Sequence, residues 1–427
     1  MYSKFGQFIN GKWQPSTNKE TYEVINPATE EIIGKASKAS PEDVDKALKS
    51  AEKGFEIWKK TPPWQRSYII RKIADLIRKK NEVLAKWLTL EVGKPLAEGL
   101  GEVNGAADIF EWNAEETKRI YGQTVESRFE NTRIHVYYQP VGVVAALVPW
   151  NFPIVLAARK ISTALAAGCS VICKPDVITP GCVMEMVDII KEAGVPPGVV
   201  NLLSGDPASI SSQLISSDTV KKISVTGSTR VGKLILKQAS DKVQRVTMEL
   251  SGHAPFIVFD DVDIKKVADM AIAAKFRNNG QVCISPSRFY IHETKKDDFT
   301  KLFVEKTSKL KIGNGLADEG NVVIVGRGSP IILSGRNDVF RVGLIANLEE
   351  RISRVMKVWS LNLDDAKSMI SRRDEARSYY VKRYFGVDDP DAAEIYHMVI
   401  NTSFVGEEYS KDLIVEASKL LRRGRLL

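Results

Sequence analysis

Long apolar runs are missing from this 427-residue sequence. No stretch reaches the ~18 apolar residues that a membrane-spanning helix needs. The first residues, MYSKFGQFINGKW, contain no apolar core of signal-peptide length. The sequence therefore predicts a protein of the cytoplasm that has no membrane partner.

Cysteine is also scarce, and the four cysteines are Cys169, Cys173, Cys182 and Cys283. No pair of them has zinc-ligand spacing with partner histidines, so we expect no metal site. The first three lie in or beside apolar stretches, which is typical of small buried side chains in a reducing compartment. Cys283 has a different setting, described below.

A large charge of one sign on one segment is absent as well. The net charge is +8, but lysines and arginines are interleaved with acids along the whole chain. This distribution indicates a solvated surface rather than a basic stripe, and we expect no nucleic-acid partner.

The sequence does contain a change of periodicity. Residues 7–34 alternate in short strand-like stretches, whereas apolar residues recur at helical spacing from Pro41 to about Ile120. Ser40, followed by Pro41, Glu42 and Asp43, is typical of a helix start.

From residue 130 to residue 270, short apolar runs alternate with helical patterns. We expect helices over IVLAARKISTALAAG, ending at Gly168, and over VMEMVDIIKEAG. Strands are expected at GVVAALVPW, SVICKP, VVNLLSG, KKISVTGS, QRVTMEL and APFIVFD. This alternation indicates βαβ units in a parallel sheet, so the predicted fold class is α/β, with ligands at the carboxyl ends of the strands.

One glycine-containing turn lies between a strand and a helix, in VTGSTRVGK at residues 225–233. Its backbone N–H groups and the following helix N-terminus suit a phosphate. The turn is neither a phosphate-binding loop of the GxxxxGK[ST] type nor the six-position dinucleotide fingerprint. An ordinary strand-to-helix turn remains the alternative.

Two reactive side chains occur in polar settings. Cys283 follows Asn-Asn-Gly-Gln-Val in FRNNGQVCISP, which suggests a turn that presents the thiol. A nucleophilic cysteine needs a base or a water-activating carboxylate, and Glu249 ends an apolar strand just before Ser251 and Gly252. The alternatives are a buried cysteine and an exposed strand-terminal acid.

Two further strand ends carry polar groups. Asn151 lies in PWNFP, where flanking prolines make a rigid turn that aims an amide at a ligand or serves only as a turn. Lys174 lies in CKPDVITP, at the end of another predicted strand.

Taken together and in this order, these motifs resemble the aldehyde dehydrogenase superfamily. PWNFP, the strand-end Lys-Pro, TGST-x-VGK, Glu-Leu-x-Gly and NGQ-x-C all occur, and the resemblance runs from about Gly6 to Gly320. It implies that Cys283 adds to an aldehyde and that the Asn151 amide and the Cys283 N–H hold the oxyanion. It also implies that Glu249 activates the water that releases the acid.

The resemblance implies NAD or NADP as the cofactor. Lys174, counted also among the catalytic residues, would bind the adenosine ribose, and the remaining cofactor-binding residues would be Trp150, Thr226, Gly227, Ser228, Gly232 and Leu250. Val177 stands where NAD-preferring members usually place a glutamate, which leans towards NADP or dual use. Ser251 replaces a common glycine.

Within the superfamily, the succinate-semialdehyde dehydrogenases are most similar. FEWNAEETKRIYG and ELSGHAPFIVFDD carry this likeness. Arg159 and Arg277 match arginines that would hold the distal carboxylate of the substrate, an aldehyde. Two ordinary helix arginines remain the alternative.

After Gly320 the resemblance changes. The Glu-x-Phe-Gly-Pro element and the arm that joins subunits in homo-oligomers of the family are missing, and residues 321–418 resemble the later part of a cytidylate-kinase-like protein. RRDEARSYYVKRYFG would be its lid, with Arg372, Arg373 and Arg377 on phosphates. The chain has no GxxxxGK[ST], so no nucleotide cradle accompanies this fragment.

The expected organisation therefore has three parts. Residues 1–250 form a parallel-sheet dinucleotide-binding domain with an N-terminal helical region, residues 251–320 an incomplete α/β catalytic domain, and residues 321–427 a partial P-loop-kinase-like α/β segment, as in a gene fusion. We expect weak or no dehydrogenase activity from such a chain. A nucleoside-monophosphate kinase relative and a non-catalytic fusion product are the alternatives.

Overall fold

The computed structural model describes residues 2–310, 313, 315–316, 340–359, 361–385, 387–389 and 391–422. Its chain divides into two compact units. One comprises Met1–Ile257, Ala273–Tyr290 and Lys311–Val322, and the other comprises Val258–Ile272, Ile291–Leu310 and Val323–Leu427. No helix in the described part of the chain is long and apolar enough to cross a membrane.

The first unit contains a seven-stranded sheet of order β11-β10-β7-β8-β9-β1-β2. Its five parallel strands are β7 (Val143–Leu147), β8 (Ser170–Lys174), β9 (Val200–Leu202), β10 (Val220–Gly227) and β11 (Arg245–Leu250). The N-terminal hairpin of β1 (Gln7–Ile9) and β2 (Lys12–Gln14) extends the sheet in antiparallel fashion beside β9. The predicted parallel sheet is thereby confirmed.

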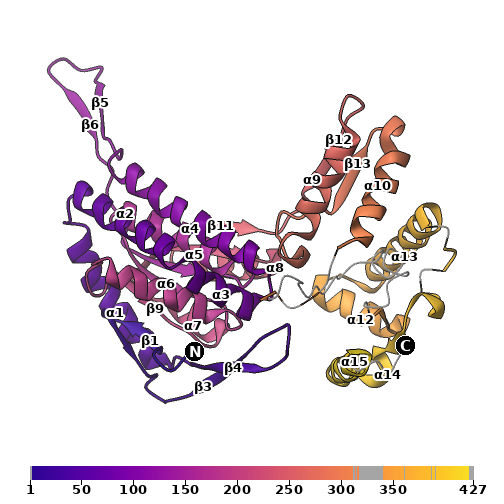
Figure 1. The fold of residues 1–427 in the computed structure, drawn as a ribbon. Helices are drawn as coiled ribbons and strands as arrows, with labels where there is room; N and C mark the ends of the chain where they lie inside the picture. Colours follow the sequence, from indigo (N-terminus) through magenta and orange to yellow (C-terminus); the bar gives the residue numbers. More distant parts are fainter. Residues whose placement is uncertain are drawn as a thin grey trace. The chain divides into compact units, whose positions relative to one another are not determined.

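Helices connect the parallel strands, as the alternating pattern predicted (Figure 1). They are α5 (Pro153–Ala166), α6 (Pro180–Glu192), α7 (Pro207–Ser216) and α8 (Thr229–Ser240). β7 and β8 are buried along their whole length, because helices cover both faces of this part of the sheet. Two hydrophobic clusters form the core, one of them including Ile161 and Leu165 of α5 and the other Ile172 of β8.

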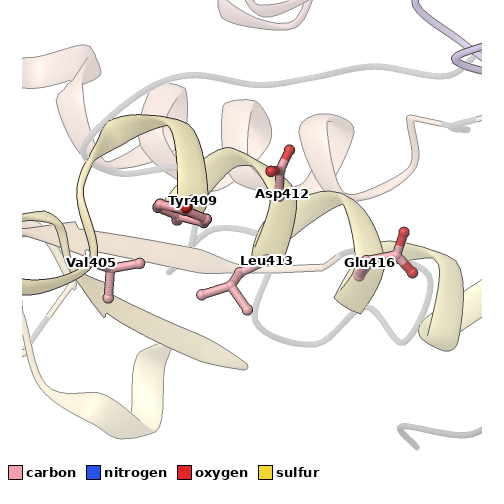
Figure 2. Close-up of a pocket in the computed structure, with 5 residues that line it drawn as sticks. All are labelled: Val405, Tyr409, Asp412, Leu413 and Glu416. Atoms are coloured by element: carbon pink, nitrogen blue, oxygen red, sulfur yellow. The ribbon is translucent and has the colours of Figure 1, made fainter.

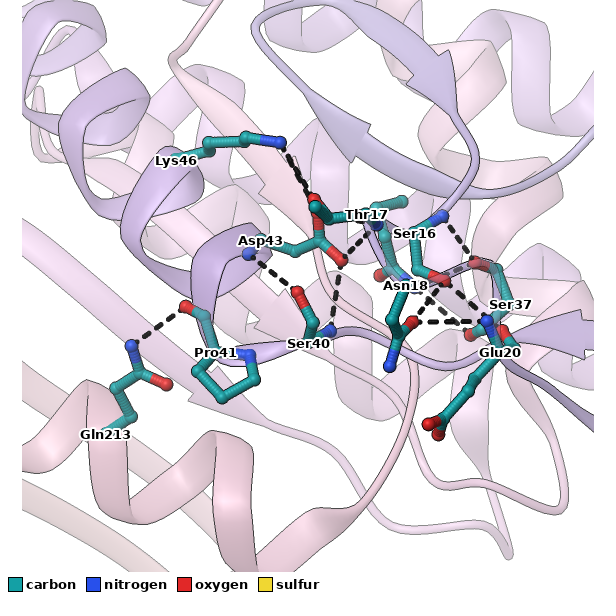
Figure 3. Close-up of polar contacts among 11 residues, drawn as sticks. Ser16, Thr17, Asn18, Glu20, Ser37, Ser40, Pro41, Asp43, Lys46 and Gln213 are labelled. Carbon is teal, nitrogen blue, oxygen red and sulfur yellow. Dashed lines mark hydrogen bonds and ion pairs between the residues drawn. The ribbon is translucent and has the colours of Figure 1, made fainter.

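Four helices precede the parallel strands: α1 (Pro41–Trp58), α2 (Pro63–Lys79), α3 (Asn81–Val92) and α4 (Leu96–Thr117). The helix start predicted at Ser40 is confirmed, because Ser40 and Asp43 form a reciprocal capping box (Figure 3). Asp43 also accepts hydrogen bonds from Thr17, so the same carboxylate fixes the preceding loop to α1.

Shorter elements complete this half of the chain. The pairs β3 (Thr21–Ile25) with β4 (Ile32–Ser37), and β5 (Gln123–Glu126) with β6 (Arg133–Val136), are antiparallel hairpins. β12 (Pro255–Val258), predicted as a strand, pairs with β13 (Arg288–Ile291) and not with the parallel sheet. The remaining helices are α9 (Ile264–Phe276), η1 (Arg277–Gly280), η2 (Glu293–Lys295) and α10 (Lys296–Ser308).

The residues from 340 onward form a small α/β arrangement. β14 (Val342–Ile345) and β15 (Met398–Asn401) pair in parallel. Around them the chain forms α12 (Leu348–Trp359), α13 (Leu363–Phe385), η3 (Ala393–Ile395), α14 (Thr402–Val405) and α15 (Glu407–Arg422). We call residues 340–422 the C-terminal region and residues 2–257 the N-terminal region.

Candidate active site

The carboxyl ends of four parallel strands carry most of the predicted site residues. Leu147 at the end of β7 is in register with Lys174 at the end of β8 and with Val225 of β10. Gly227 of β10 is in register with Leu250 of β11. Trp150 and Asn151 follow β7 directly. Parallel strand order thus brings residues about 100 positions apart to one edge of the sheet, where α/β proteins bind ligands.

The turn between β10 and α8 has the geometry of an anion site. Ser228 is the N-cap of α8, and its side chain accepts a hydrogen bond from the Val231 N–H at 3.3 Å. A Cβ atom on Gly227 would meet nothing within 4 Å, whereas one on Gly232 would lie 2.8 Å from Leu250. The space beside Gly227 and the N-terminus of α8 suit a diphosphate, and Gly232 lets α8 pack closely on β11.

Lys174 is a nearly buried cation, with 5% of its surface exposed. Burial lowers the pKa of its ammonium group, and the nearby Asp176 and Asp206 oppose that shift. Its main-chain oxygen accepts a hydrogen bond from the Val148 N–H at 3.0 Å. A lysine held in this way offers donors to the hydroxyl groups of a ribose, so the residue fits the role that the sequence predicted.

Asn151 joins two motifs that lie 130 residues apart. Its side-chain Nδ2 donates to the main-chain oxygen of Gln281 at 3.0 Å, and its own main-chain oxygen accepts from Asn278 Nδ2 at 2.8 Å. Asn278 and Asn279 have φ values of 49° and 57°, a left-handed conformation that asparagine tolerates better than most residues. Cys283 follows this turn and is partly exposed. The turn that precedes Cys283 is thereby fixed to the Asn151 loop.

Glu249 lies on β11 beside β10. Its Oε2 is 3.4 Å from Thr226 Oγ1, and its Oε1 is 3.9 Å from an Arg159 guanidinium nitrogen. The carboxylate is 40% exposed, as a group that activates water from solvent should be. Within the described residues, Glu249 and Cys283 form no hydrogen bond with each other.

The structure adds Lys160, which the sequence reasoning missed. Lys160 Nζ donates to Thr226 Oγ1 at 2.8 Å and to Ser224 Oγ at 3.4 Å. Desolvation by burial lowers its pKa to about 8. A lysine inside the largely apolar helix IVLAARKISTALA was an available signal, because a lysine is almost never buried without a partner.

The two predicted substrate arginines have different settings. Arg159 is 57% exposed on α5 and lies near Glu249. Arg277 stands over the ring of Phe152, with its guanidinium carbon 5.1 Å from the ring centre. Among the described residues, the carboxylate that pairs with Arg159 is Glu249, at 3.9 Å, and no ion pair of Arg277 is found.

A buried ion pair lies behind the Asn151 turn and was also missed. Lys94, between α3 and α4, pairs with Glu102 of α4, and both side chains are almost fully buried. The sequence signal was weak, because lysine and glutamate are common near helix ends and their contacts with Asn151 and Ile154 join residues more than 50 positions apart.

The C-terminal region holds the other predicted anion-binding residues. Arg372 and Arg373 are exposed on α13, and Arg372 Nε lies 3.4 Å from the Ser368 main-chain oxygen. The side chain of Arg377 lies outside the described residues. A surface pocket of about 380 Å³ is lined by five residues of α14 and α15, none of them a predicted site residue: Val405, Tyr409, Asp412, Leu413 and Glu416 (Figure 2).

Comparison with protein-family models gives two matches. A model described as the aldehyde dehydrogenase family matches residues 13–325. A model described as the cytidylate kinase-like family matches residues 258–404, which begins earlier and ends sooner than the expected range of 321–418. Residues 258–325 are therefore matched by both models.

Comparison with individual proteins agrees with the first match. The chain is 40% identical over 311 residues to the glutarate-semialdehyde dehydrogenase of Pseudomonas putida, covering 73% of this chain and 65% of that protein. It is 40% identical over 308 residues to the succinate-semialdehyde dehydrogenase [NADP(+)] GabD of Escherichia coli, covering 72% and 64%. The chain thus spans just under two thirds of these relatives.

A solved structure is also similar. The crystal structure of succinate-semialdehyde dehydrogenase from Burkholderia pseudomallei superimposes with a TM-score of 0.73 at 38% sequence identity. The match covers 83% of this chain and 70% of that one.

Proposed function

Since the chain belongs to the aldehyde dehydrogenase family, we propose that it oxidises succinate semialdehyde to the carboxylate with NAD(P)+, through Cys283. The observation that carries the proposal is the pair of hydrogen bonds that fixes the Asn151 loop to the Asn278–Gln281 turn just before Cys283. A thiol that attacks a carbonyl carbon needs a donor nearby that stabilises the resulting oxyanion, and these adjoining turns carry both groups.

In the proposed reaction, Cys283 Sγ attacks the aldehyde carbon, and the carbonyl oxygen becomes an oxyanion. One N–H of the Asn151 amide is engaged by Gln281, and the other donates to the oxyanion together with the Cys283 N–H. NAD(P)+, held at the strand ends, would supply the hydride acceptor, and loss of the hydride from the thiohemiacetal carbon would leave a thioester on Cys283. Glu249 takes a proton from water, the water oxygen attacks the thioester carbon, and the thiolate leaves.

The cofactor would lie along the strand ends. Gly227, Ser228 and Gly232 shape the diphosphate site, and Lys174 supports the adenosine ribose. Trp150, Thr226 and Leu250 would line the rest of the cofactor site. Val177 brings no carboxylate to the position where one would repel a 2′-phosphate, so we favour NADP.

The substrate's distal carboxylate would be held by Arg159 and Arg277. The Phe152 ring fixes the guanidinium plane of Arg277, which prepares it for bidentate pairing with a carboxylate. Both arginines come from the turns and helices that also carry Asn151 and Cys283.

We also propose that the chain consists of a dinucleotide-binding domain (residues 1–250), an incomplete catalytic domain (251–320) and a kinase-like segment (321–427). We expect such a chain to oxidise aldehydes slowly. A catalytic cysteine works only when held close to the hydride acceptor. If residues 321–427 do not supply that support, replacing them with the C-terminal third of the Escherichia coli relative should raise the rate by about 100-fold. An equal rate from the natural chain would show that its own C-terminal residues are sufficient.

The test of the function is NADPH formation by purified chain with succinate semialdehyde. Cys283→Ala should abolish it, because no other thiol is exposed: Cys169, Cys173 and Cys182 are all buried. The matched control is Cys182→Ala, which should keep the rate. Aldehyde oxidation by Cys283→Ala at the parent rate would end the proposal.

A further inference from the structure

The segment between α3 and α4 and the first turns of α4 contact the turn that contains Asn151. Lys94 is fully buried and forms an ion pair with Glu102. Its ammonium group also donates to the main-chain oxygen of Asn151 at 3.1 Å and lies 4.1 Å from the centre of the Phe152 ring. One cation therefore contacts both the residue that carries the amide and the residue that follows it.

Glu102 holds the other side of the same turn. While one carboxylate oxygen pairs with Lys94, the other accepts hydrogen bonds from the Ile154 and Val155 N–H groups at 3.0 and 3.2 Å. These N–H groups belong to the first turn of α5, which favours a negative charge. Lys94 thus contacts the main-chain oxygen of Asn151, and Glu102 of α4 accepts from the start of α5, the helix that follows Asn151.

The same segment also reaches the turn before Cys283. Glu98, one helical turn before Glu102 on α4, accepts from the Asn278 N–H at 2.5 Å. The main-chain oxygen of Gly93 accepts from Asn279 Nδ2 at 3.0 Å. Both asparagines have a positive φ, so these contacts stabilise a backbone conformation that is otherwise costly.

We propose that Lys94 and Glu102 are positioning residues, which set the direction of the Asn151 amide relative to Cys283; this inference rests on the proposed function. Stability alone is a weak reason for such a pair, because apolar side chains of similar volume often replace a buried ion pair without loss. What an apolar pair would not supply is a donor to the Asn151 carbonyl and an acceptor for the start of α5.

The test uses three variants of the full-length chain: Lys94→Met, Glu102→Gln and the uncharged double variant Lys94→Met/Glu102→Gln. Each should lower kcat by about 10- to 100-fold, less than the roughly 100- to 1,000-fold expected when Asn151→Ala removes the donor itself. The KM for NADP should stay near the parent value. In an Asn151→Ala background, Lys94→Met should cause no further loss, because both changes act through one amide.

Glu91→Gln is the matched control. Glu91 is also a buried carboxylate that caps a helix, accepting from the Gly181 and Cys182 N–H groups at 2.7 and 2.9 Å, but it caps α6. Glu91→Gln should keep kcat, because the hydrogen bonds of Glu91 go to Tyr2, Gly181 and Cys182 and not to the Asn151 turn. Parent-like kcat in the double variant, or losses that add to that of Asn151→Ala, would overturn the inference.

A second readout does not depend on aldehyde turnover. Cys283 is the one partly exposed cysteine, so its alkylation by iodoacetamide can be followed by mass spectrometry. Glu102→Gln should change this rate several-fold while Glu91→Gln leaves it unchanged, because only Glu102 supports the turns that carry Asn151 and Cys283. If the parent chain oxidises no aldehyde, the proposed function fails, and the alkylation rates still decide the positioning role: equal rates in all three proteins contradict it.

Discussion

The N-terminal and C-terminal regions are both α/β, yet they hold their polar residues in different ways. In the N-terminal region, Asn151 contacts Lys94 and Gln281, and Glu102 accepts from the start of α5; each of these contacts joins residues more than 50 positions apart. In the C-terminal region, the described core is a small cluster around Ile352, Ala366 and Ile370. The two described arginines that were predicted to bind phosphate, Arg372 and Arg373, are exposed on α13. Buried neighbours thus fix the direction of the Asn151 side chain, whereas the guanidinium groups of Arg372 and Arg373 face solvent.

The largest effect should come from the core of the N-terminal region. Leu165→Ala removes a fully buried side chain of α5 and should lower the free energy of unfolding by about 4 kcal/mol, whereas Ile370→Ala on α13 should cost about 2 kcal/mol because a small cluster can close over the gap. Urea unfolding would be followed by the fluorescence of the buried Trp58 and Trp87. We expect Leu165→Ala alone to shift that transition, and an equal shift by both variants would remove the contrast.

The next largest difference should be in how the stability of each region depends on pH, because a carboxyl group is buried in one and partly exposed in the other. Burial raises the pKa of Glu91 to about 7. The contribution of the protonated Glu91 carboxyl to the free energy of unfolding is therefore complete below about pH 4.5 and is lost as the pH rises through 7. That loss corresponds to roughly 3 kcal/mol. Glu91→Gln should flatten this slope between pH 5 and pH 7.

Glu350 in the C-terminal region is the control for this pH dependence. A hydrogen bond from Ser403 lowers the pKa of Glu350, so its contribution is lost only as the pH falls below the ordinary range of a glutamate. Glu350→Gln should therefore leave the slope between pH 5 and pH 7 unchanged. A parent-like slope in Glu91→Gln would show that the Glu91 carboxyl does not titrate in this window.

The arginines give a comparison of function. Arg277→Met should lower kcat/KM for succinate semialdehyde by an amount that corresponds to about 1.5–3 kcal/mol of transition-state stabilisation. The kcat/KM for butyraldehyde should not change, because that aldehyde has no carboxylate. Arg372→Ala on α13 should change neither value. Steady-state rates with both aldehydes would decide, and an equal loss on both would assign Arg277 to folding or to the turn before Cys283.

The smallest effect should come from helix caps. Ser40→Ala removes one half of the capping box of α1 and should cost about 1 kcal/mol (Figure 3). Asn401 caps α14, which spans only Thr402–Val405, so Asn401→Ala should cost less than about 0.5 kcal/mol. Thermal unfolding would rank the two, and the reverse order would show that helix length does not govern the cost.

Local patterns predicted much of the fold. Ser40 with Pro41 and Asp43 marked the start of α1, and the strands of the parallel sheet followed from apolar runs between helical patterns. The pairing of β12 with β13 escaped prediction, because an isolated apolar run does not specify its partner.

The candidate site was predicted in part. Motif order pointed to Asn151 and Cys283, and the structure ties their two turns together. Lys94 and Glu102 were missed because their contacts with Asn151 and with the start of α5 join residues more than 50 positions apart, which a local pattern does not contain. Lys160 was missed although its helix offered a local signal.

The central claim, that Cys283 forms a thioester which Glu249 helps to hydrolyse, can be tested by trapping that thioester. Glu249→Gln would be mixed with succinate semialdehyde and NADP+, quenched in acid and digested, and the peptide containing Cys283 would be weighed by mass spectrometry. We predict that this peptide gains one succinyl group, that the gain is larger in Glu249→Gln than in the parent, and that it is absent without NADP+. An unmodified Cys283 peptide in Glu249→Gln, under conditions in which the parent forms NADPH, would contradict the account.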